Sequence, residues 1–257
     1  MKLIPLGTNG YHPSFARQTA SYLALFDNAA FLLDAGTGVA RMREPAVQEA
    51  MRGYDELNVI LSHYHVDHIV GLYFLNHWPG GAKVIHAPTC PFIAADPREA
   101  IERLFKPPLN SFSMAGNDMR IVPINAERMR IGGYDVSFWP QQHPGGSVGV
   151  RIGDEIAYLT DTVVMPENAG KVRGVQCLLH ELWLTDEEAA ADEDERNRHS
   201  TFGPLASFLK ACAPKTAMTV HLSPTRTDEE AKQMATDLSN ACGLVVRVPN
   251  EGSLYEL

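Results

Sequence analysis

The sequence predicts an α/β protein with two β-sheets in the middle and helices outside. Its 257 residues are 45% apolar, which is typical of a globular chain rather than a disordered or fibrous one. Short apolar runs rich in β-branched and aromatic residues alternate with amphipathic segments throughout. Because no repeat, low-complexity tract or linker interrupts this alternation, we assign residues 1–257 to a single domain.

Each predicted strand is a brief run bounded by Gly, Asp, Asn or Pro, which favour turns. The predicted strands are Lys2–Leu6, Ser21–Phe26, Phe31–Leu33, Asn58–Leu61, Lys83–His86, Arg120–Ile124, Asp135–Trp139, Val148–Ile152, Ile156–Leu159, Gln176–Leu179, Ala217–Val220 and Leu244–Val248. The predicted helices are Ala46–Arg52, Ile69–His77, Arg98–Phe105, Leu205–Ala211 and Glu229–Cys242. The last helix is the best defined, because Asp228 can cap its N-terminus and Gly243 follows its end.

Charge and cysteine content exclude several classes of protein. A net charge of −9 and a pI near 5.5 argue against a dedicated nucleic-acid binder, whose surface is usually basic. The N-terminus lacks the features of a signal peptide, and no segment has the length of a membrane span. The four cysteines stand far apart, which predicts free thiols and a reducing, cytoplasmic location.

The strongest functional signal is the segment Ser62–His68, which reads SHYHVDH. It places His63, His65, Asp67 and His68 at the point where a predicted strand turns into a helix, so that all four side chains can enter one space. Histidine and carboxylate are the ligands that Zn²⁺ prefers. Four residues so close in sequence cannot all surround one ion with good geometry. We therefore expect two ions, with further ligands from other parts of the chain.

Three further candidates come directly after predicted strands, where loops carry function. His143 follows DVSFWPQQ, Asp161 follows IAYLT, and His221 follows TAMTV. Two other histidines, His77 and His86, are interpreted instead as surface or helix-end residues.

These motifs, in this order, resemble those of the metallo-β-lactamase superfamily over nearly the whole chain. Besides SHYHVDH and the three later residues, LLDAGTG (32–38) is similar to the early strand and turn of that family. The resemblance implies a four-layered αββα sandwich, two mixed sheets with helices outside, and metals at one edge of the sheets. It also implies that Asp34 orients His65.

The resemblance implies a set of metal ligands divided between two ions that share one bridging carboxylate. They are His63, His65 and His143 for one ion, Asp67, His68 and His221 for the other, and Asp161 for the bridge. Two such ions activate a water molecule for attack near neutral pH. Zinc is the default metal for these ligands, and Mn²⁺ or Fe²⁺ can also occupy them.

The region between Asp161 and His221 narrows the expected chemistry. LLHELWLTDEE followed by RHSTFGPLA resembles ribonuclease Z and its small phosphodiesterase relatives, where a glutamate and the histidine of a His-Ser-Thr motif act together. Here they would be Glu181 and His199, the imidazole supplying a proton to the phosphate or its leaving oxygen. Asp67, Glu181 and His199 are therefore the predicted catalytic residues, Asp67 also as a ligand.

We predict a dinuclear hydrolase of a small or cyclic phosphodiester, without a nucleic-acid or membrane partner; a homodimer is left open. Bacterial ribonuclease Z grips tRNA with a long arm between the residues that match His143 and Asp161, and here a hairpin fills that interval. The acidic segment Asp186–Glu195 is expected to be a solvated loop or helix face close to the site mouth, where it would repel a polyanion.

Three alternatives remain from the sequence alone. A lactonase or β-lactamase of the same fold would attack a carbonyl carbon, with Tyr64 or Tyr158 as electrophile. An armless RNA-processing endonuclease of the ribonuclease Z type would use the same site. A metal-stabilised binding or regulatory domain is disfavoured, because every predicted ligand position is filled.

Overall fold

Two seven-stranded sheets form the centre of the computed structural model, which describes residues 1–110, 114 and 118–257. The first sheet has the strand order β14-β1-β2-β3-β4-β5-β6, and the second has the order β13-β12-β11-β10-β9-β8-β7. The strands of the first are β1 (Lys2–Gly7), β2 (Ser21–Leu25), β3 (Ala30–Leu33), β4 (Glu56–Ile60), β5 (Ala82–Pro88), β6 (Met119–Ile124) and β14 (Tyr255–Glu256). Those of the second are β7 (Arg128–Ile131), β8 (Tyr134–Gln141), β9 (Ser147–Ile152), β10 (Ile156–Leu159), β11 (Cys177–Glu181), β12 (Thr216–Val220) and β13 (Val246–Arg247).

Both sheets are mixed in the same way, with an antiparallel part that continues into a parallel part. In the first sheet the pairing changes at β3, which is antiparallel to β2 and parallel to β4. In the second it changes at β10, which is antiparallel to β9 and parallel to β11. Because parallel neighbours end at the same edge of a sheet, loops that follow several strands meet there.

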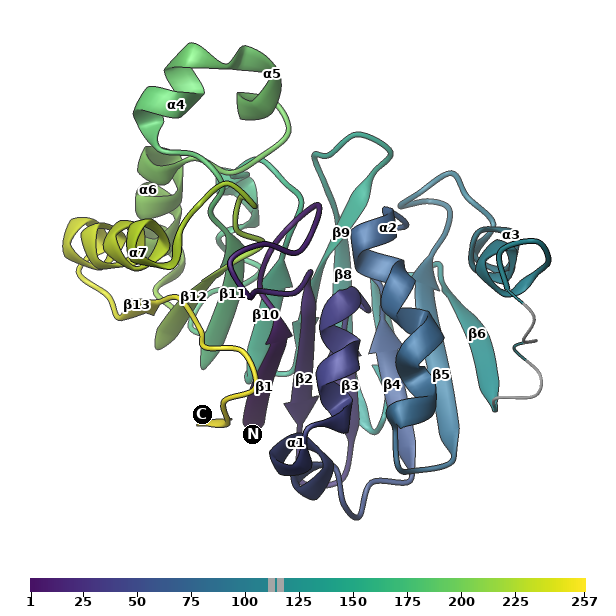
Figure 1. Cartoon of the computed structure of the whole chain (residues 1–257). Coiled ribbons are helices and arrows are strands. Elements are labelled where there is room, and N and C mark those ends of the chain that lie inside the picture. The colour runs from purple at the N-terminus through teal and green to yellow at the C-terminus, as the bar shows by residue number, and fades with distance from the viewer. Residues whose placement is uncertain (111–113, 115–117) are drawn as a thin grey trace.

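Helices cover the outer faces of both sheets (Figure 1). Against the first sheet lie η1 (Thr37–Arg43), α1 (Pro45–Ala50), α2 (Val66–Ile69) and η2 (Val70–His77); α3 (Pro97–Glu102) and η3 (Arg103–Phe105) follow β5. Against the second lie α6 (Phe202–Cys212) and α7 (Asp228–Cys242), while η5 (Pro166–Asn168), α4 (Asp186–Ala191) and α5 (Glu193–Arg196) lie between strands in sequence. The four-layered αββα sandwich that the resemblance implies is therefore confirmed.

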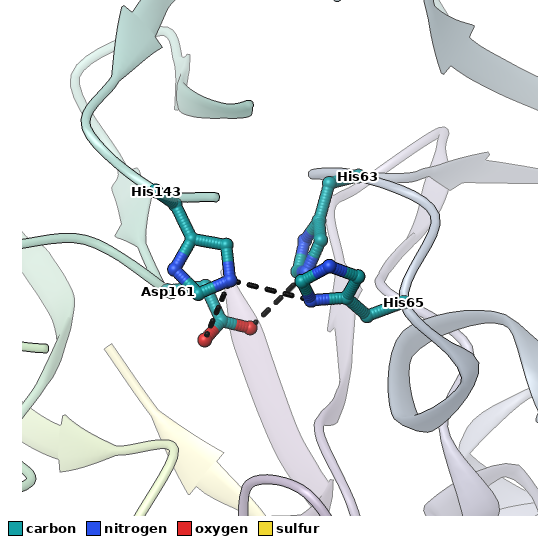
Figure 2. Close-up of side chains that lie close together, drawn as sticks. All are labelled: His63, His65, His143 and Asp161. Atoms are coloured by element: carbon teal, nitrogen blue, oxygen red, sulfur yellow. Dashed lines mark hydrogen bonds and ion pairs between the residues drawn. The ribbon is translucent and has the colours of Figure 1, made fainter. Parts of the chain in front are cut away.

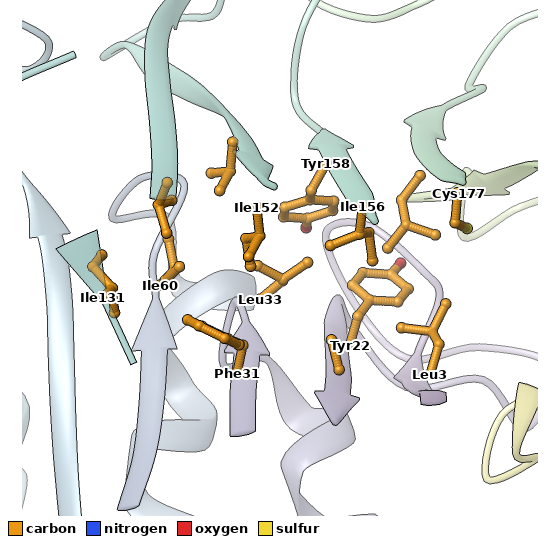
Figure 3. Close-up of a cluster of buried hydrophobic side chains, with 14 of the residues drawn as sticks. Leu3, Tyr22, Phe31, Leu33, Ile60, Ile131, Ile152, Ile156, Tyr158 and Cys177 are labelled. Carbon is orange, nitrogen blue, oxygen red and sulfur yellow. The ribbon is translucent and has the colours of Figure 1, made fainter. Parts of the chain in front are cut away.

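The main core lies between the two sheets (Figure 3). Tyr22 from β2 and Tyr158 from β10 pack there with ring centroids 5.3 Å apart. Residues of β2 and β3 are buried on both faces, because a sheet lies on one side and helices on the other. Burial of each large apolar side chain contributes about 1.5–3 kcal/mol, so this layer gives the strand ends a rigid support.

Every predicted strand and helix overlaps an observed one, but details differ. Strands β7 and β14 were not predicted. The predicted helix Ile69–His77 is a 3₁₀ helix over Val70–His77, and Ile69 is the last residue of α2. Helix α7 is capped by Thr227 rather than by Asp228, since Thr227 and Glu230 form a capping box. The acidic segment folds into α4 and α5, and the predicted hairpin of β9 and β10 is confirmed.

His86 corrects a prediction, because it is neither at the surface nor at a helix end. It lies in β5 with 6% of its surface exposed, and its Nε2 contacts Asn58 Oδ1 at 3.0 Å. The parallel strands β4 and β6 enclose β5 on both sides, and every residue of β5 after the first is buried, His86 included.

The C-terminal segment anchors the loop between β1 and β2. The Glu251 carboxylate accepts hydrogen bonds from the backbone N–H groups of Thr8 and Gln18, both at 2.9 Å, and pairs with Arg41 at 2.9 Å. All four cysteines are free thiols, as predicted. Within the described residues, no helix combines the length and the apolar character needed to cross a membrane.

Candidate metal centre

The predicted ligands converge at the edge where the strands of both sheets end. His63 and His65 follow β4, Asp67 and His68 lie in α2, and the other three follow β8, β10 and β12. The backbone is constrained at this edge. Asp161 and His221 have φ angles of 42° and 48°, in the left-handed region that non-glycine residues seldom adopt. Such strain persists where the surrounding structure holds it, and it concentrates at functional sites.

One group of side chains joins His63, His65, His143 and Asp161 (Figure 2). One ligand atom from each lies within 4.8 Å of the others. Nε2 of His143 is 3.2 Å from Nδ1 of His65 and 3.6 Å from Oδ1 of Asp161. Nε2 of His63 is 3.3 Å from Oδ2 of Asp161.

A second group joins Asp67, His68, His221 and again Asp161. Nε2 of His68 is 2.7 Å from Oδ2 of Asp161 and 3.2 Å from Nε2 of His221. Oδ2 of Asp67 is 3.3 Å from Nε2 of His68. Asp161 thus belongs to both groups and has one carboxylate oxygen near members of each, as a bridge requires.

The donor set fits divalent metal ions. Nε2 of His63 is buried and has no hydrogen-bond partner among the described residues, although it points toward a carboxylate. Imidazole nitrogens that meet at 3.2 Å, with carboxylate oxygens beside them, form a compact set of N and O donors. Such a set is what Zn²⁺ and similar ions bind in proteins.

Asp34 holds the N-terminal half of the centre, but through a different histidine from the predicted one. Its Oδ2 lies 2.7 Å from Nδ1 of His68, whereas His65 is exposed and faces His143. The prediction that Asp34 orients His65 is therefore wrong. Helix α2 starts at Val66, and its first turn brings His68 back toward β3.

Further hydrogen bonds fix the carboxylate of Asp34. Oδ1 accepts from the N–H of Ser62 at 2.6 Å, and Oδ2 accepts from the hydroxyls of Ser62 and Tyr158 at 2.7 and 2.8 Å. The Ser62 hydroxyl can then accept from Nδ1 of His63, 2.9 Å away. One buried carboxylate therefore directs Nε2 of both His63 and His68 toward the centre.

Glu181 has the corresponding role in the C-terminal half. Its Oε1 lies 2.9 Å from Nδ1 of His221 and 2.6 Å from Nδ1 of His199. Its Oε2 accepts from the backbone N–H of Ser200 at 2.9 Å. The indole of Trp183 stacks on the His199 ring with centroids 4.2 Å apart. The predicted pair of Glu181 and His199 is thus brought together beside the two ligand groups.

Charge interactions outweigh burial at most of these residues. Burial alone would lower the pKa of His68, but the carboxylates of Asp67 and Asp34 raise it well above its usual value. Burial would raise the pKa of Glu181, but His199 and His221 hold it at about 2. Burial would lower the pKa of His199, and Glu181 raises it instead. At His63, His65 and His143, by contrast, burial prevails and lowers the pKa, so these imidazoles favour the neutral form that binds a metal ion.

A pocket of about 590 Å³ opens over the centre. His199 and Glu195 line it, so the acidic segment does reach the site mouth as predicted. Tyr11, Trp183 and Arg198 also line it and were not predicted. The sequence held signals for Tyr11 and Trp183 as pocket residues. Trp183 is two residues from Glu181, and Tyr11 lies in the Gly-containing loop GTNGYHPS.

Neither tyrosine considered as an electrophile is available to a substrate. The Tyr158 hydroxyl is buried and donates to Asp34, and burial raises its pKa well above the usual value. The Tyr64 hydroxyl donates to the carbonyl of Pro88, and Tyr64 does not line the pocket.

Comparisons with known proteins agree with this geometry. The model of the Beta-lactamase superfamily domain matches residues 30–222. A ribonuclease Z of Methanopyrus kandleri is 28% identical over 277 aligned positions, which cover 95% of this chain and 96% of the relative. The metallo-β-lactamase fold protein YhfI of Bacillus subtilis superposes with a TM-score of 0.76 at 17% identity, covering 99% of both chains. A diphosphatase of the PhnP family superposes with a TM-score of 0.71 at 18% identity, covering 100% of this chain and 97% of the other.

Proposed function

The chain is a metallohydrolase that belongs to the beta-lactamase superfamily, and from this premise we propose that it hydrolyses a small phosphodiester with two divalent metal ions. The observation that carries the proposal is the Glu181–His199 pair, joined at 2.6 Å, because its His199 lines the same pocket as members of both ligand groups. Phosphodiester cleavage needs charge stabilisation at the phosphoryl oxygens and a proton for the departing alkoxide. The two ligand groups and His199 are suited to these two needs.

In the proposed assignment each ion has three ligands of its own, and Asp161 is shared. The ligands are His63, His65 and His143 for one ion and Asp67, His68 and His221 for the other. Zinc is the default, with Mn²⁺ or Fe²⁺ as substitutes. When bound, the ions would supply a nucleophile at neutral pH and stabilise charge on the phosphoryl oxygens.

His199 is the proposed proton donor. Its Nδ1 is held by Glu181, which leaves Nε2 on the side of Glu195, 4.0 Å from Oε2 of that residue. Glu181 raises the pKa of His199 against the effect of burial, so that the imidazolium is available near neutral pH. Trp183 restricts the rotation of the ring by stacking on it. These contacts keep the donor oriented before the substrate arrives.

The leaving group provides the test of this role. The variant His199→Ala should retain both metal ions but slow hydrolysis of a diester with a poor alkyl leaving group by about 10²–10⁴-fold. The loss should be much smaller for a nitrophenolate ester, which departs without a proton. His77→Ala, at the end of η2 and outside the pocket, serves as the control. Loss of a metal ion in His199→Ala, or an equal loss for both leaving groups, would contradict the role.

A panel of substrates tests the reaction class itself. Activated phosphodiesters, phosphomonoesters, lactones and a chromogenic β-lactam should be assayed on one preparation of metal-loaded protein. We expect the phosphodiesters to be the best substrates. The lactonase alternative is disfavoured because Tyr158 and Tyr64 are both engaged away from the pocket. A lactone turned over faster than any diester would favour that alternative.

The ribonuclease Z relative supports a second candidate, an armless RNA-processing endonuclease. We favour the small substrate for two reasons. The hairpin of β9 and β10 pairs Ile156 with Ile152 and leaves no arm between His143 and Asp161. The pocket also borders the acidic segment, which would repel a polyanion. Turnover of a precursor tRNA should therefore be far slower than that of bis(p-nitrophenyl) phosphate, and efficient 3′ cleavage of the tRNA would reverse the preference.

A further inference from the structure

We propose that Tyr11 and Val66 form an apolar platform at the pocket mouth, which selects phosphodiesters whose retained substituent is a flat aromatic group. The inference rests on the proposed phosphodiester chemistry and specifies the substrate class for the same site. The platform consists of these two side chains. The backbone N–H of Tyr11 contacts Asp67, and Val66 precedes Asp67 in the sequence.

Both platform side chains are exposed to an unusual degree. Tyr11 has 74% of its surface accessible and Val66 has 67%. Of the large hydrophobic residues that are exposed in the described ranges, these are the two that line the pocket above the metal ligands. Large apolar groups left in water beside a pocket are typical of a surface that a ligand covers.

The backbone holds Tyr11 in this place at a conformational cost. Its φ angle is 61°, in the left-handed region that is unfavourable for an aromatic residue. The N–H of Tyr11 donates to Oδ2 of Asp67 at 2.7 Å, and the N–H of Gly10 donates to the carbonyl of Leu222 at 2.9 Å. An exposed aromatic ring, held in a strained conformation by a predicted metal ligand, indicates a function for that ring.

Gly10 fixes how closely the loop approaches the centre. A Cβ atom at this position would collide with the ring of His221 and with the indole of Trp183. Only glycine lets the backbone pass here, and Tyr11 follows directly. The loop between β1 and β2 therefore lies against the metal site, with the Tyr11 ring at its rim.

The lining of the pocket combines charged and apolar side chains. Tyr11 is joined to the centre through Asp67, which belongs to one ligand group. Glu195 and Arg198 also line the pocket, where Glu195 approaches His199 and the carbonyl of Arg198 contacts Nδ1 of His143. When a diester is held at the centre with its leaving oxygen toward His199, its retained substituent meets the rest of the lining, in which Tyr11 and Val66 are the exposed large apolar side chains. An aromatic ring there gains contact that a methyl group does not.

Two diesters with the same leaving group test the proposal. They are phenyl p-nitrophenyl phosphate and methyl p-nitrophenyl phosphate, whose retained substituents are phenyl and methyl. The wild-type protein should have the higher kcat/KM for the phenyl ester. Tyr11→Ala should lower the phenyl-to-methyl ratio by about three- to tenfold, and Tyr11→Phe should keep it, because the ring is retained and the backbone N–H still reaches Asp67.

The matched control is Phe15→Ala. Phe15 is an exposed aromatic of the same loop with a φ of 47°, but it lies outside the pocket, so its removal should leave the ratio unchanged. A ratio that is the same in the wild type and in Tyr11→Ala, or that falls equally in Phe15→Ala, overturns the platform.

A binding measurement separates this inference from the proposed function. Calorimetry should give a lower Kd for phenylphosphonate than for methylphosphonate, and Tyr11→Ala should reduce that preference about three- to tenfold. If neither diester is hydrolysed, the proposed function fails. The relative affinity for the two phosphonates then tests the platform independently of hydrolysis. Equal affinities for the two phosphonates in the wild type would overturn the platform even if both diesters are hydrolysed.

Discussion

Asp34 and Glu181 are two fully buried carboxylates that support the centre from opposite sheets, and they do so differently. Asp34 follows β3 and directs one ligand histidine directly, His68, and a second, His63, through the hydroxyl of Ser62. Glu181 ends β11 and shares a single oxygen between His221 and His199. Only one of the two histidines held by Glu181 is a predicted ligand.

This difference indicates a division of labour between the halves of the molecule. The N-terminal half has a carboxylate whose histidine contacts are all to predicted metal ligands. Under the proposed function, the C-terminal half has one that would couple metal binding to proton transfer, because the same oxygen contacts a predicted ligand and the proposed donor. Changes on the two sides should therefore differ in their effects on metal affinity and on the dependence of the rate on the leaving group.

Asp161→Ala should have the largest effect, because Asp161 belongs to both ligand groups. Metal content, measured by elemental analysis, should fall from about two equivalents per chain, and activity should fall with it by at least about 10³-fold. Full activity in a preparation that contains almost no metal would contradict the whole scheme.

Asp34→Asn and Glu181→Gln test the division of labour directly. Asp34→Asn should weaken metal binding about 10–100-fold and, once metal is saturating, should affect good and poor leaving groups alike. Glu181→Gln should weaken metal binding less and should slow poor leaving groups selectively, by about 10²-fold. Competition with a metal chelator and a comparison of two leaving groups distinguish the variants. Identical signatures for the two would refute the division.

His86 shows what happens to a buried histidine that has no carboxylate partner. Burial, with a smaller effect from Arg120, lowers its pKa to about 4, so the folded state resists protonation. The unfolded chain gains the proton near pH 6.5, and stability is therefore lost as pH falls from there toward 4. Between pH 7.5 and 5 the loss should be about 2 kcal/mol.

Denaturant unfolding at the two pH values checks this prediction. His86→Gln should reduce the pH dependence of the free energy of unfolding, whereas His12→Gln, an exposed histidine, should leave it as in the wild type. The interpretation does not survive if the wild type and His86→Gln lose equal stability on acidification.

Tyr158→Phe should have the smallest effect. It removes one hydrogen bond to Asp34, whose Oδ2 keeps the Ser62 hydroxyl and His68 as partners. The expected cost is about 1.5 kcal/mol in the free energy of unfolding, with metal content unchanged. Hydrolysis should also persist, since the hydroxyl is buried; a complete loss of activity with metal retained would instead restore Tyr158 as an electrophile.

The sequence was most informative where function is local. The segment Ser62–His68 contributes four of the predicted ligands, and a single turn between β4 and α2 brings them together. His143, Asp161 and His221 are far apart in sequence and meet because the strands that they follow, β8, β10 and β12, belong to one sheet. Each could be predicted only as a polar residue after a strand, and their order along the chain supplied the rest.

Other features could not be derived from pattern alone. From the sequence, either His65 or His68 could contact Asp34. The contact is made by His68, because α2 begins at Val66 and its first turn brings His68 back toward Asp34. Strand β7 has the sequence RMRI, with two cations in four residues, and its place at the edge of a sheet explains this composition. The capping box of Thr185 and Glu188 at the start of α4 follows the known sequence pattern. It was not predicted, because Glu188 lies in a run of acidic residues that was interpreted only as a charged segment.

The contact between Glu251 and the β1–β2 loop also has a consequence for the timing of biosynthesis. Thr8 and Glu251 are 243 positions apart, so a ribosome adding about 5–20 residues per second makes them roughly 10–50 seconds apart. During that interval the loop that carries Gly10 and Tyr11 has no carboxylate to accept the N–H groups of Thr8 and Gln18. The nascent chain therefore holds an unfinished entrance to its metal centre until the segment around Glu251 has left the ribosome.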